Sequence, residues 1–257
     1  MHLVALSELT GTLEAEVAAL ARDLGATPYD IRLLLAGGTP AIVLTTPDPG
    51  RASALVEAMR ARRQVAVACS LAEVVPASAM ISMRRFALER EAIVAVDADV
   101  RLPALDVLCL LRATVRRDVT TTTETEQRKI APGKAVLTGG LALTKREKTT
   151  VTSTSEERDQ VLYVFRRSGE TPWLLNESRT QYGGLGADLA PTSVVNFQTT
   201  IRRLRGLSPN AVYDERLLQR RRATGAGSAA SDTDVWAHLL ALGIAEAARA
   251  APPYRRL

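Results

Sequence analysis

One stretch, residues 112–167, constrains the fold more than any other part of the chain. It holds two long runs of polar, β-favouring residues on either side of the pair Gly139-Gly140. Because glycine adopts positive φ angles without steric cost, a Gly-Gly pair between such runs is typical of a hairpin turn. The sequence therefore predicts one long β-hairpin in which Val115 faces Val164. A two-stranded ribbon of this length is marginally stable alone, so we expect other parts of the chain to support it.

The tip of this hairpin is the predicted interaction site. Around the two glycines the residues are apolar on both faces of the expected strands, whereas a half-buried strand alternates polar with apolar residues. Cationic residues flank the apolar ones on both sides. The predicted interaction residues are Lys129, Lys134, Val136, Leu137, Gly139, Gly140, Leu141, Leu143, Lys145, Arg146 and Lys148. Because exposed apolar surface costs about 25 cal/mol per Å², we expect something to cover this tip.

Three kinds of cover remain open. The first is another protein chain, either a second copy in a homo-oligomer or a partner protein, bound by the tip or by the exposed strand edges. The second is an anionic membrane surface, where the apolar tip would enter the interface and the lysines would meet lipid headgroups. The third is the core of the same chain. Nucleic acid is less favoured because the tip has no aromatic residue for base stacking, although arginine clusters at 202–205 and 220–222 keep it open.

Lysine usage singles out the same region. The chain has 33 basic residues, and its only lysines are Lys129, Lys134, Lys145 and Lys148. Arginine-rich and alanine-rich usage is typical of a high-GC genome, which would replace lysine everywhere. Lysine kept only in the hairpin indicates a surface that uses a flexible, strongly hydrated point charge; with so few lysines, coincidence is the alternative.

Composition and motifs argue against an enzyme. The net charge of +5 is below that of a dedicated nucleic-acid binder, and the hydrophobic share of 46% is ordinary for a folded protein. The two histidines, His2 and His238, have no neighbouring ligands at metal-binding spacing. The sequence contains no nucleophile elbow, Walker A motif or dinucleotide fingerprint. We therefore expect no catalytic residues, no metal and no cofactor.

The cysteines and apolar runs bear on the compartment. Cys69 and Cys109 each lie within an apolar run, and we expect both to be buried and free. No apolar run approaches the roughly 18 residues that a membrane-spanning helix needs, and the start of the chain lacks the pattern of a secretory signal. These features predict a cytoplasmic protein.

Residues 1–75 are predicted to form a small α/β module. Apolar and amphipathic runs follow the order β-α-α-β-α-β, with Gly25 and Gly37-Gly38 ending the first two helices. We expect three strands covered on one face by helices. This spacing of helices, glycines and strands resembles the C-terminal domain of ribosomal protein L7/L12, which implies that fold. The resemblance implies no ribosomal role, because the chain lacks that domain's lysine-rich helix surface.

Residues 82–207 are predicted to form a mostly antiparallel β module from which the hairpin 112–167 protrudes. An amphipathic helix from Pro191 to Leu204 closes it. Short strands closed by one helix resemble bacterial pleckstrin-homology-like domains, which implies the fold and no ligand. Residues 208–257 are predicted to add a short helix at 213–218, a linker and a last helix that docks on the body or on a partner.

The sequence thus predicts an α+β protein that acts as a non-enzymatic assembly scaffold through its hairpin. The first alternative is a peripheral membrane adaptor that inserts the same tip. The second is a weak nucleic-acid-binding module.

Overall fold

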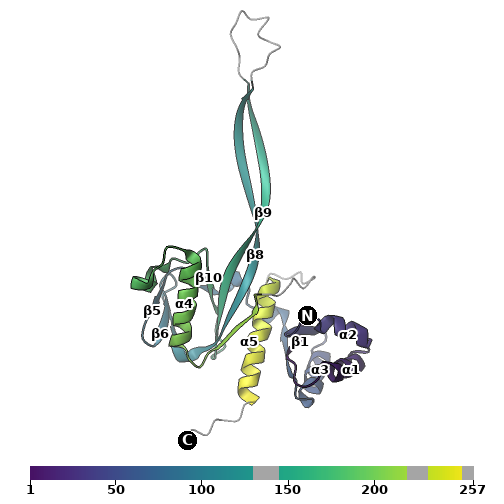
Figure 1. Cartoon of the computed structure of the whole chain (residues 1–257). Coiled ribbons are helices and arrows are strands. Elements are labelled where there is room, and N and C mark those ends of the chain that lie inside the picture. The colour runs from purple at the N-terminus through teal and green to yellow at the C-terminus, as the bar shows by residue number, and fades with distance from the viewer. Residues whose placement is uncertain (130–144, 219–230, 251–257) are drawn as a thin grey trace, which may run out of the picture. The chain divides into compact units, whose positions relative to one another are not determined.

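The computed structural model describes residues 1–129, 145–218 and 231–250, with the backbone alone described for 116–129, 145–157 and 250. Its helices and strands place the chain in the α+β class, as predicted (Figure 1). The chain divides into two compact units. Residues 115–159 form one unit, and residues 1–114 with 160–257 form the other, larger unit.

The first sheet of the larger unit has the strand order β2-β1-β3. Its strands are β1 (His2–Glu8), β2 (Ala41–Thr46) and β3 (Val65–Ser70), and β1 pairs antiparallel with both neighbours. Between them lie α1 (Leu13–Leu24), α2 (Pro28–Leu35) and α3 (Pro49–Ala61). The predicted order β-α-α-β-α-β is therefore confirmed.

Local signals set the ends of these helices. Thr27 and Asp30 form a reciprocal capping box at the start of α2, which satisfies backbone N–H groups that the helix itself leaves free. Gly25 ends α1 in the left-handed conformation, with φ of 65°. Val4 and Leu6 of β1 pack into a core cluster with residues of all three helices.

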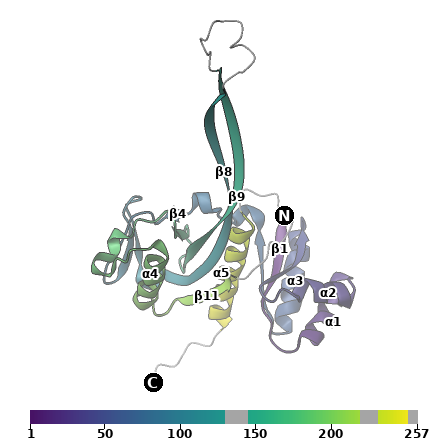
Figure 2. The same ribbon diagram turned by 45° about the horizontal axis from the view of Figure 1, so that its top comes forward.

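The last helix, α5 (Asp232–Ala250), covers the opposite face of this sheet. Ser7, which points away from the side of Val4 and Leu6, contacts Gly243 and donates a hydrogen bond to the Leu239 carbonyl. The sequence predicted helices on one face only, because the strand that receives α5 lies more than 200 residues away in the chain. Figure 2 shows α5 beside β1, and the helix also contacts β3 and the strand β11 (Val212–Leu217).

The second sheet has five strands in the order β11-β8-β9-β10-β4. They are β4 (Ile81–Ser82), β8 (Val107–Lys129), β9 (Lys145–Arg166), β10 (Trp173–Asn176) and β11 (Val212–Leu217). β10 pairs antiparallel with β9, but β11 pairs parallel with β8 and β4 pairs parallel with β10. The sheet therefore contains both parallel and antiparallel pairs, whereas the sequence predicted a mostly antiparallel module.

The short helix predicted at 213–218 is wrong, because this segment is strand β11. Its backbone pairs with β8, with Tyr213 opposite Leu110 and Leu217 opposite Ala113. Such long-range pairing overrides the weak local preference of a charged six-residue segment.

The remaining elements close the core of the second sheet. Strands β5 (Phe86–Leu88), β6 (Ala92–Ala95) and β7 (Val100–Pro103) form an antiparallel meander, and the predicted closing helix is confirmed as α4 (Ser193–Leu207). Phe197 of α4 and Trp173 of β10 are almost fully buried in one cluster with residues of these strands. This packing fixes α4 against the second sheet. Two of its strands, β8 and β9, continue into residues 115–129 and 145–159, which we call the β-ribbon.

The hairpin strands pair in a register different from the predicted one. At the base of the two strands the Arg167 N–H donates a hydrogen bond to the Asp106 carbonyl at 2.7 Å. Farther along, the Arg112 side chain donates a hydrogen bond to the Gln160 side chain. Residue numbers therefore rise along β8 while those of the facing residues fall along β9, so the two strands pair antiparallel. This register places Val164 several residues away from its predicted partner Val115.

Candidate interaction site

The eleven predicted interaction residues fall into two groups. Lys129 ends β8, Lys145 begins β9, and Arg146 and Lys148 follow within β9, with their backbone described. The other predicted residues lie outside the described residues: Lys134, Val136, Leu137, Gly139, Gly140, Leu141 and Leu143. The sequence prediction for the tip itself therefore stays a prediction.

The strands that lead to the tip are paired with each other along the smaller unit. The pairing of β11 with β8 ends at Ala113, and the pairing of β10 with β9 begins at Val161. Among the described residues, no third strand pairs with 115–129 or 145–159. Each ribbon strand therefore keeps an outer edge whose backbone N–H and C=O groups have no strand partner there.

The sequence of these edges is polar and β-favouring. Residues 119–123 and 149–155 contain only threonine, serine and valine, without a charged residue. Charged residues and proline are the usual protection of an exposed edge against pairing with another chain. These two segments lack both, so their edges are open to an added strand.

Arg112 of β8 contacts side chains of β9, β11 and α4 at the base of the ribbon. Its Nε donates to the Gln160 side chain of β9 at 2.8 Å, and its Nη1 donates to Glu215 of β11 at 3.0 Å. Its guanidinium also lies 5.9 Å from the ring centre of Phe197 in α4. These contacts lock the strands together where the ribbon strands leave the five-stranded sheet. No local sequence pattern predicts these contacts, because all partners are distant in the chain.

A second cluster holds the end of β9. The Asp106 carboxylate accepts hydrogen bonds from the Arg166 Nε at 2.8 Å and from the Ser168 backbone N–H at 2.9 Å. Burial alone would raise the pKa of Asp106, but the bonds from Ser168 and Arg166 outweigh it, and the pKa lies below its usual value. The ionised carboxylate thus fixes the strand register at the base.

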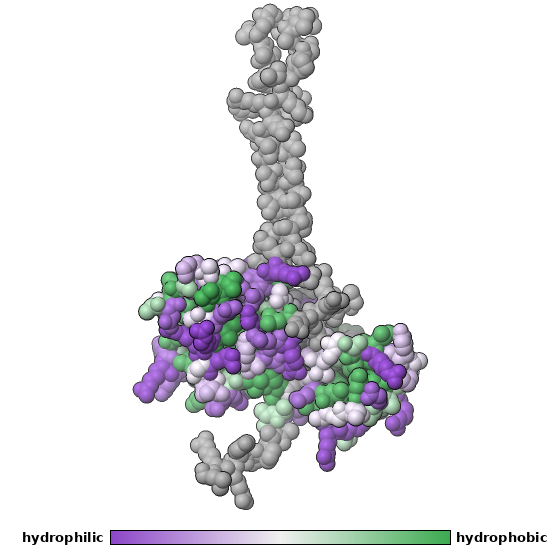
Figure 3. Space-filling model, viewed as in Figure 1, coloured by the Kyte–Doolittle hydropathy of each residue, from purple (hydrophilic) through white to green (hydrophobic). Residues whose placement is uncertain are grey.

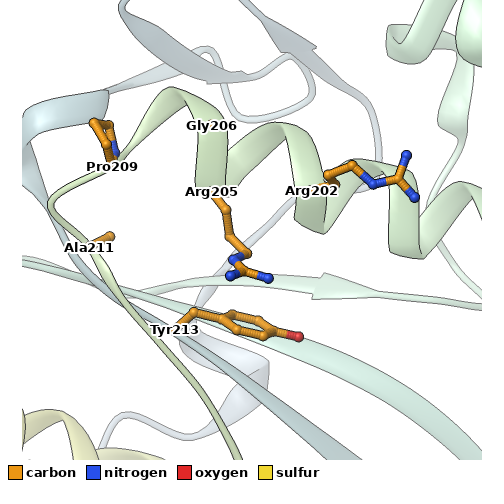
Figure 4. A pocket seen from close by; sticks show the side chains of 6 residues that line it. All are labelled: Arg202, Arg205, Gly206, Pro209, Ala211 and Tyr213. Atoms are coloured by element: carbon orange, nitrogen blue, oxygen red, sulfur yellow. The ribbon is translucent and has the colours of Figure 1, made fainter.

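A hollow of about 590 Å³ lies between the end of α4 and the segment that leads into β11 (Figure 4). Its lining residues are Arg202, Arg205, Gly206, Pro209, Ala211 and Tyr213. The guanidinium of Arg205 lies over the ring of Tyr213 (Figure 4), 4.4 Å from the ring centre. A neighbouring hollow of about 240 Å³ shares Arg202, Arg205 and Tyr213 and extends to Arg112 and Glu215. The sequence identified the arginines of α4 but missed Tyr213, whose segment was predicted to be helical.

The charges along these two hollows are mostly positive. Glu215 accepts hydrogen bonds from the Tyr213 hydroxyl and from Arg112, and both lower the pKa of its carboxyl, although burial opposes them. In the described part of the chain, Arg202 and Arg205 form no ion pair. Over the region of α4, Figure 3 shows hydrophilic side chains beside hydrophobic ones, and Arg202, Arg203 and Arg205 are exposed.

Two observations on the described residues concern metal binding and cysteine reactivity. Within 1–129, 145–218 and 231–250, no cluster of three or more His, Cys, Asp or Glu side chains is placed to hold a metal ion. Cys69 and Cys109 are both free and buried, as predicted. Burial raises the pKa of the Cys69 thiol to about 11 and that of Cys109 also above its usual value, so both are poor nucleophiles.

Two further findings bear on membranes and relatives. None of the helices in the described ranges combines the length and apolar character needed to cross a bilayer. No protein-family model, no curated protein and no solved structure matches the chain, so the two fold resemblances stay predictions.

Proposed function

We propose that this chain is a non-enzymatic assembly protein that binds through its β-ribbon. The single observation that carries the proposal is that 115–129 and 145–159 have no third strand beside them among the described residues. An unpaired edge binds another strand through backbone hydrogen bonds, which need no particular side chain.

The first expected partner is a second copy of the chain. When the same edge of two copies pairs around a twofold axis, the two strands run antiparallel and the assembly closes as a dimer. An edge of β8 against an edge of β9 would instead leave a β8 edge free at one end and a β9 edge free at the other, so the same contact could repeat and continue the assembly. The uncharged segments 119–123 and 149–155 are where we expect such pairing to begin.

The base of the ribbon supports this use. A strand that recruits a partner needs a fixed register, since a slip by one residue turns every side chain to the other face. The bonds of Arg112 to Gln160 and Glu215, and those of Asp106 to Arg166, hold this register at the base. The two free thiols agree with action in the reducing cytoplasm.

The experiment compares the full chain with two variants by light scattering after size exclusion. In one variant a short Gly-Ser turn replaces residues 130–144, which removes the tip and keeps the described strands. In the other variant Thr121 and Thr152 become lysine, which places charge on both edges. Loss of the oligomer in the lysine variant alone assigns assembly to the edges, and loss in the turn variant alone assigns it to the tip.

A membrane surface is the second candidate, because the apolar tip is flanked by the only lysines of the chain. It predicts that the monomeric chain sediments with vesicles containing phosphatidylserine. Changing Lys129, Lys134, Lys145 and Lys148 to glutamate should then abolish sedimentation and leave any self-association of the edges intact.

A further inference from the structure

We propose that the hollow between the end of α4 and β11 binds a phosphate monoester. This inference concerns the larger unit alone and does not depend on assembly through the ribbon. Its volume of about 590 Å³ lies within the range typical of small-molecule sites. Three observations support a phosphate group as the bound chemistry: the two guanidinium groups, the net charge of the lining and the small residues of the wall.

Arg202 and Arg205 both line the hollow, and in Figure 4 the guanidinium of Arg205 lies over Tyr213 whereas that of Arg202 points away from it and must turn to meet a ligand. Both are exposed on α4, and neither forms an ion pair with any described residue. By contrast, the adjacent Arg203 is paired with Asp188. Planar guanidinium groups bind phosphate oxygens through two parallel hydrogen bonds, which a lysine ammonium cannot form.

The hollow is also ordered before a ligand arrives. The guanidinium of Arg205 stacks on the ring of Tyr213, 4.4 Å from its centre, and the Tyr213 hydroxyl donates a hydrogen bond to Glu215. Glu215 in turn is held by Arg112. A ligand therefore meets an arginine whose position is already set, which lowers the entropic cost of binding.

The net charge of the lining selects a dianion. Arg112, Arg202 and Arg205 contribute three positive charges and Glu215 one negative charge along the two connected hollows, a net charge of +2. A phosphate monoester carries about −1.5 to −2 at neutral pH, whereas a single carboxylate carries only half of that. Gly206 contributes no side chain, and a Cβ atom there would meet open space, so the wall leaves room for the phosphate oxygens.

The test titrates the full chain with glycerol 3-phosphate and follows the amide signals of Gly206 and Ala211 by NMR. A parallel arm measures sedimentation with phosphatidylcholine vesicles that contain phosphatidic acid, which presents the same group on a lipid. Arg202→Gln is the test variant, and Arg203→Gln is the matched control with the same loss of charge one residue away. Thermal unfolding of both variants confirms that they fold.

The proposal predicts that Arg202→Gln weakens binding by about tenfold or more, since one charge-assisted contact is lost. Arg203→Gln should change it less than about twofold, because its exposed pair with Asp188 contributes little. A response of the soluble ester identifies a soluble ligand, and a response of the vesicles alone identifies a lipid headgroup. The proposal is overturned if neither probe binds at millimolar concentration, or if both variants weaken binding equally.

Discussion

Gly243 of α5 should be intolerant of even one added methyl group. An alanine Cβ at this position would lie 2.5 Å from the Cβ of Ser7 in β1, and Ser7 is only 3% exposed. Because carbon atoms pack at about 3.5–4.0 Å, the helix and the strand would have to separate by roughly 1 Å. Rotation of the Ser7 side chain cannot relieve the contact, since its Cβ is fixed to the backbone of β1.

The magnitude follows from two opposed terms. Overpacking of a buried contact costs about 1–3 kcal/mol, while replacing glycine by alanine within a helix gains up to about 1 kcal/mol. For Gly243→Ala we expect a net loss of about 1–2 kcal/mol in the free energy of unfolding. In a chain of this size that corresponds to a decrease in Tm of about 2–8 °C.

Urea unfolding followed by circular dichroism measures this change, and Gly206→Ala is the matched control. Gly206 lies in α4, where an added Cβ has no heavy atom within 4 Å, so the control should be unchanged or more stable by a few tenths of a kcal/mol. A double-mutant cycle with Ser7→Gly should recover at least about 1 kcal/mol of the loss. A Gly243→Ala protein as stable as the Gly206→Ala control would refute the close packing of α5 on β1.

Three further changes test other contacts of the larger unit. Arg112→Leu should lower the free energy of unfolding by about 1–2 kcal/mol, because its hydrogen bonds to Gln160 and Glu215 are lost. The control Arg101→Leu removes an exposed pair with Glu89 and should cost less than about 0.5 kcal/mol. Equal costs for the two variants would show that the bonds of Arg112 do not stabilise the base of the ribbon. Tyr163→Phe removes the donor to the buried Asp234 carboxylate at 2.9 Å and should cost about 1–3 kcal/mol by urea unfolding; a neutral change would count against this bond. Burial lowers the pKa of His238, so the unfolded chain binds this proton more readily, and stability should fall as the pH drops from about 6.5 through the lower folded-state pKa. The urea midpoint of His238→Leu should fall less than that of the unchanged chain between about pH 7.5 and 5.5, and parallel curves would rule out this contribution.

The sequence predicted the elements whose signals are local. The left-handed Gly25 ends α1 where the pattern placed it, and the capping box of Thr27 and Asp30 follows from the residue types at the start of α2. The amphipathic pattern likewise predicted α4, whose buried residues include Phe197 and Leu204. In these cases the energy that fixes the element comes from neighbours within a few residues, which a single sequence displays.

Strand pairing and packing that depend on distant partners were missed. β11 becomes a strand through its pairing with β8, and α5 finds its place on β1 through contacts such as that of Gly243 with Ser7. The hairpin was predicted, but its register was taken from the glycine pair. The register at the base is set instead by bonds to Asp106. The hollow between α4 and β11 was hidden for the same reason, since Tyr213 joins Arg205 only when β11 is a strand.

Assembly through the ribbon is tested by the mass of the chain in solution with and without residues 116–158. The variant replaces residues 116–158 by a short Gly-Ser turn, which the antiparallel register at the base allows because Val115 and Asp159 bound the smaller unit. Light scattering after size exclusion should give an oligomer for the full chain and a folded monomer for the variant. A full chain that is monomeric at tens of micromolar, with the same association state as the variant, would contradict assembly through the ribbon.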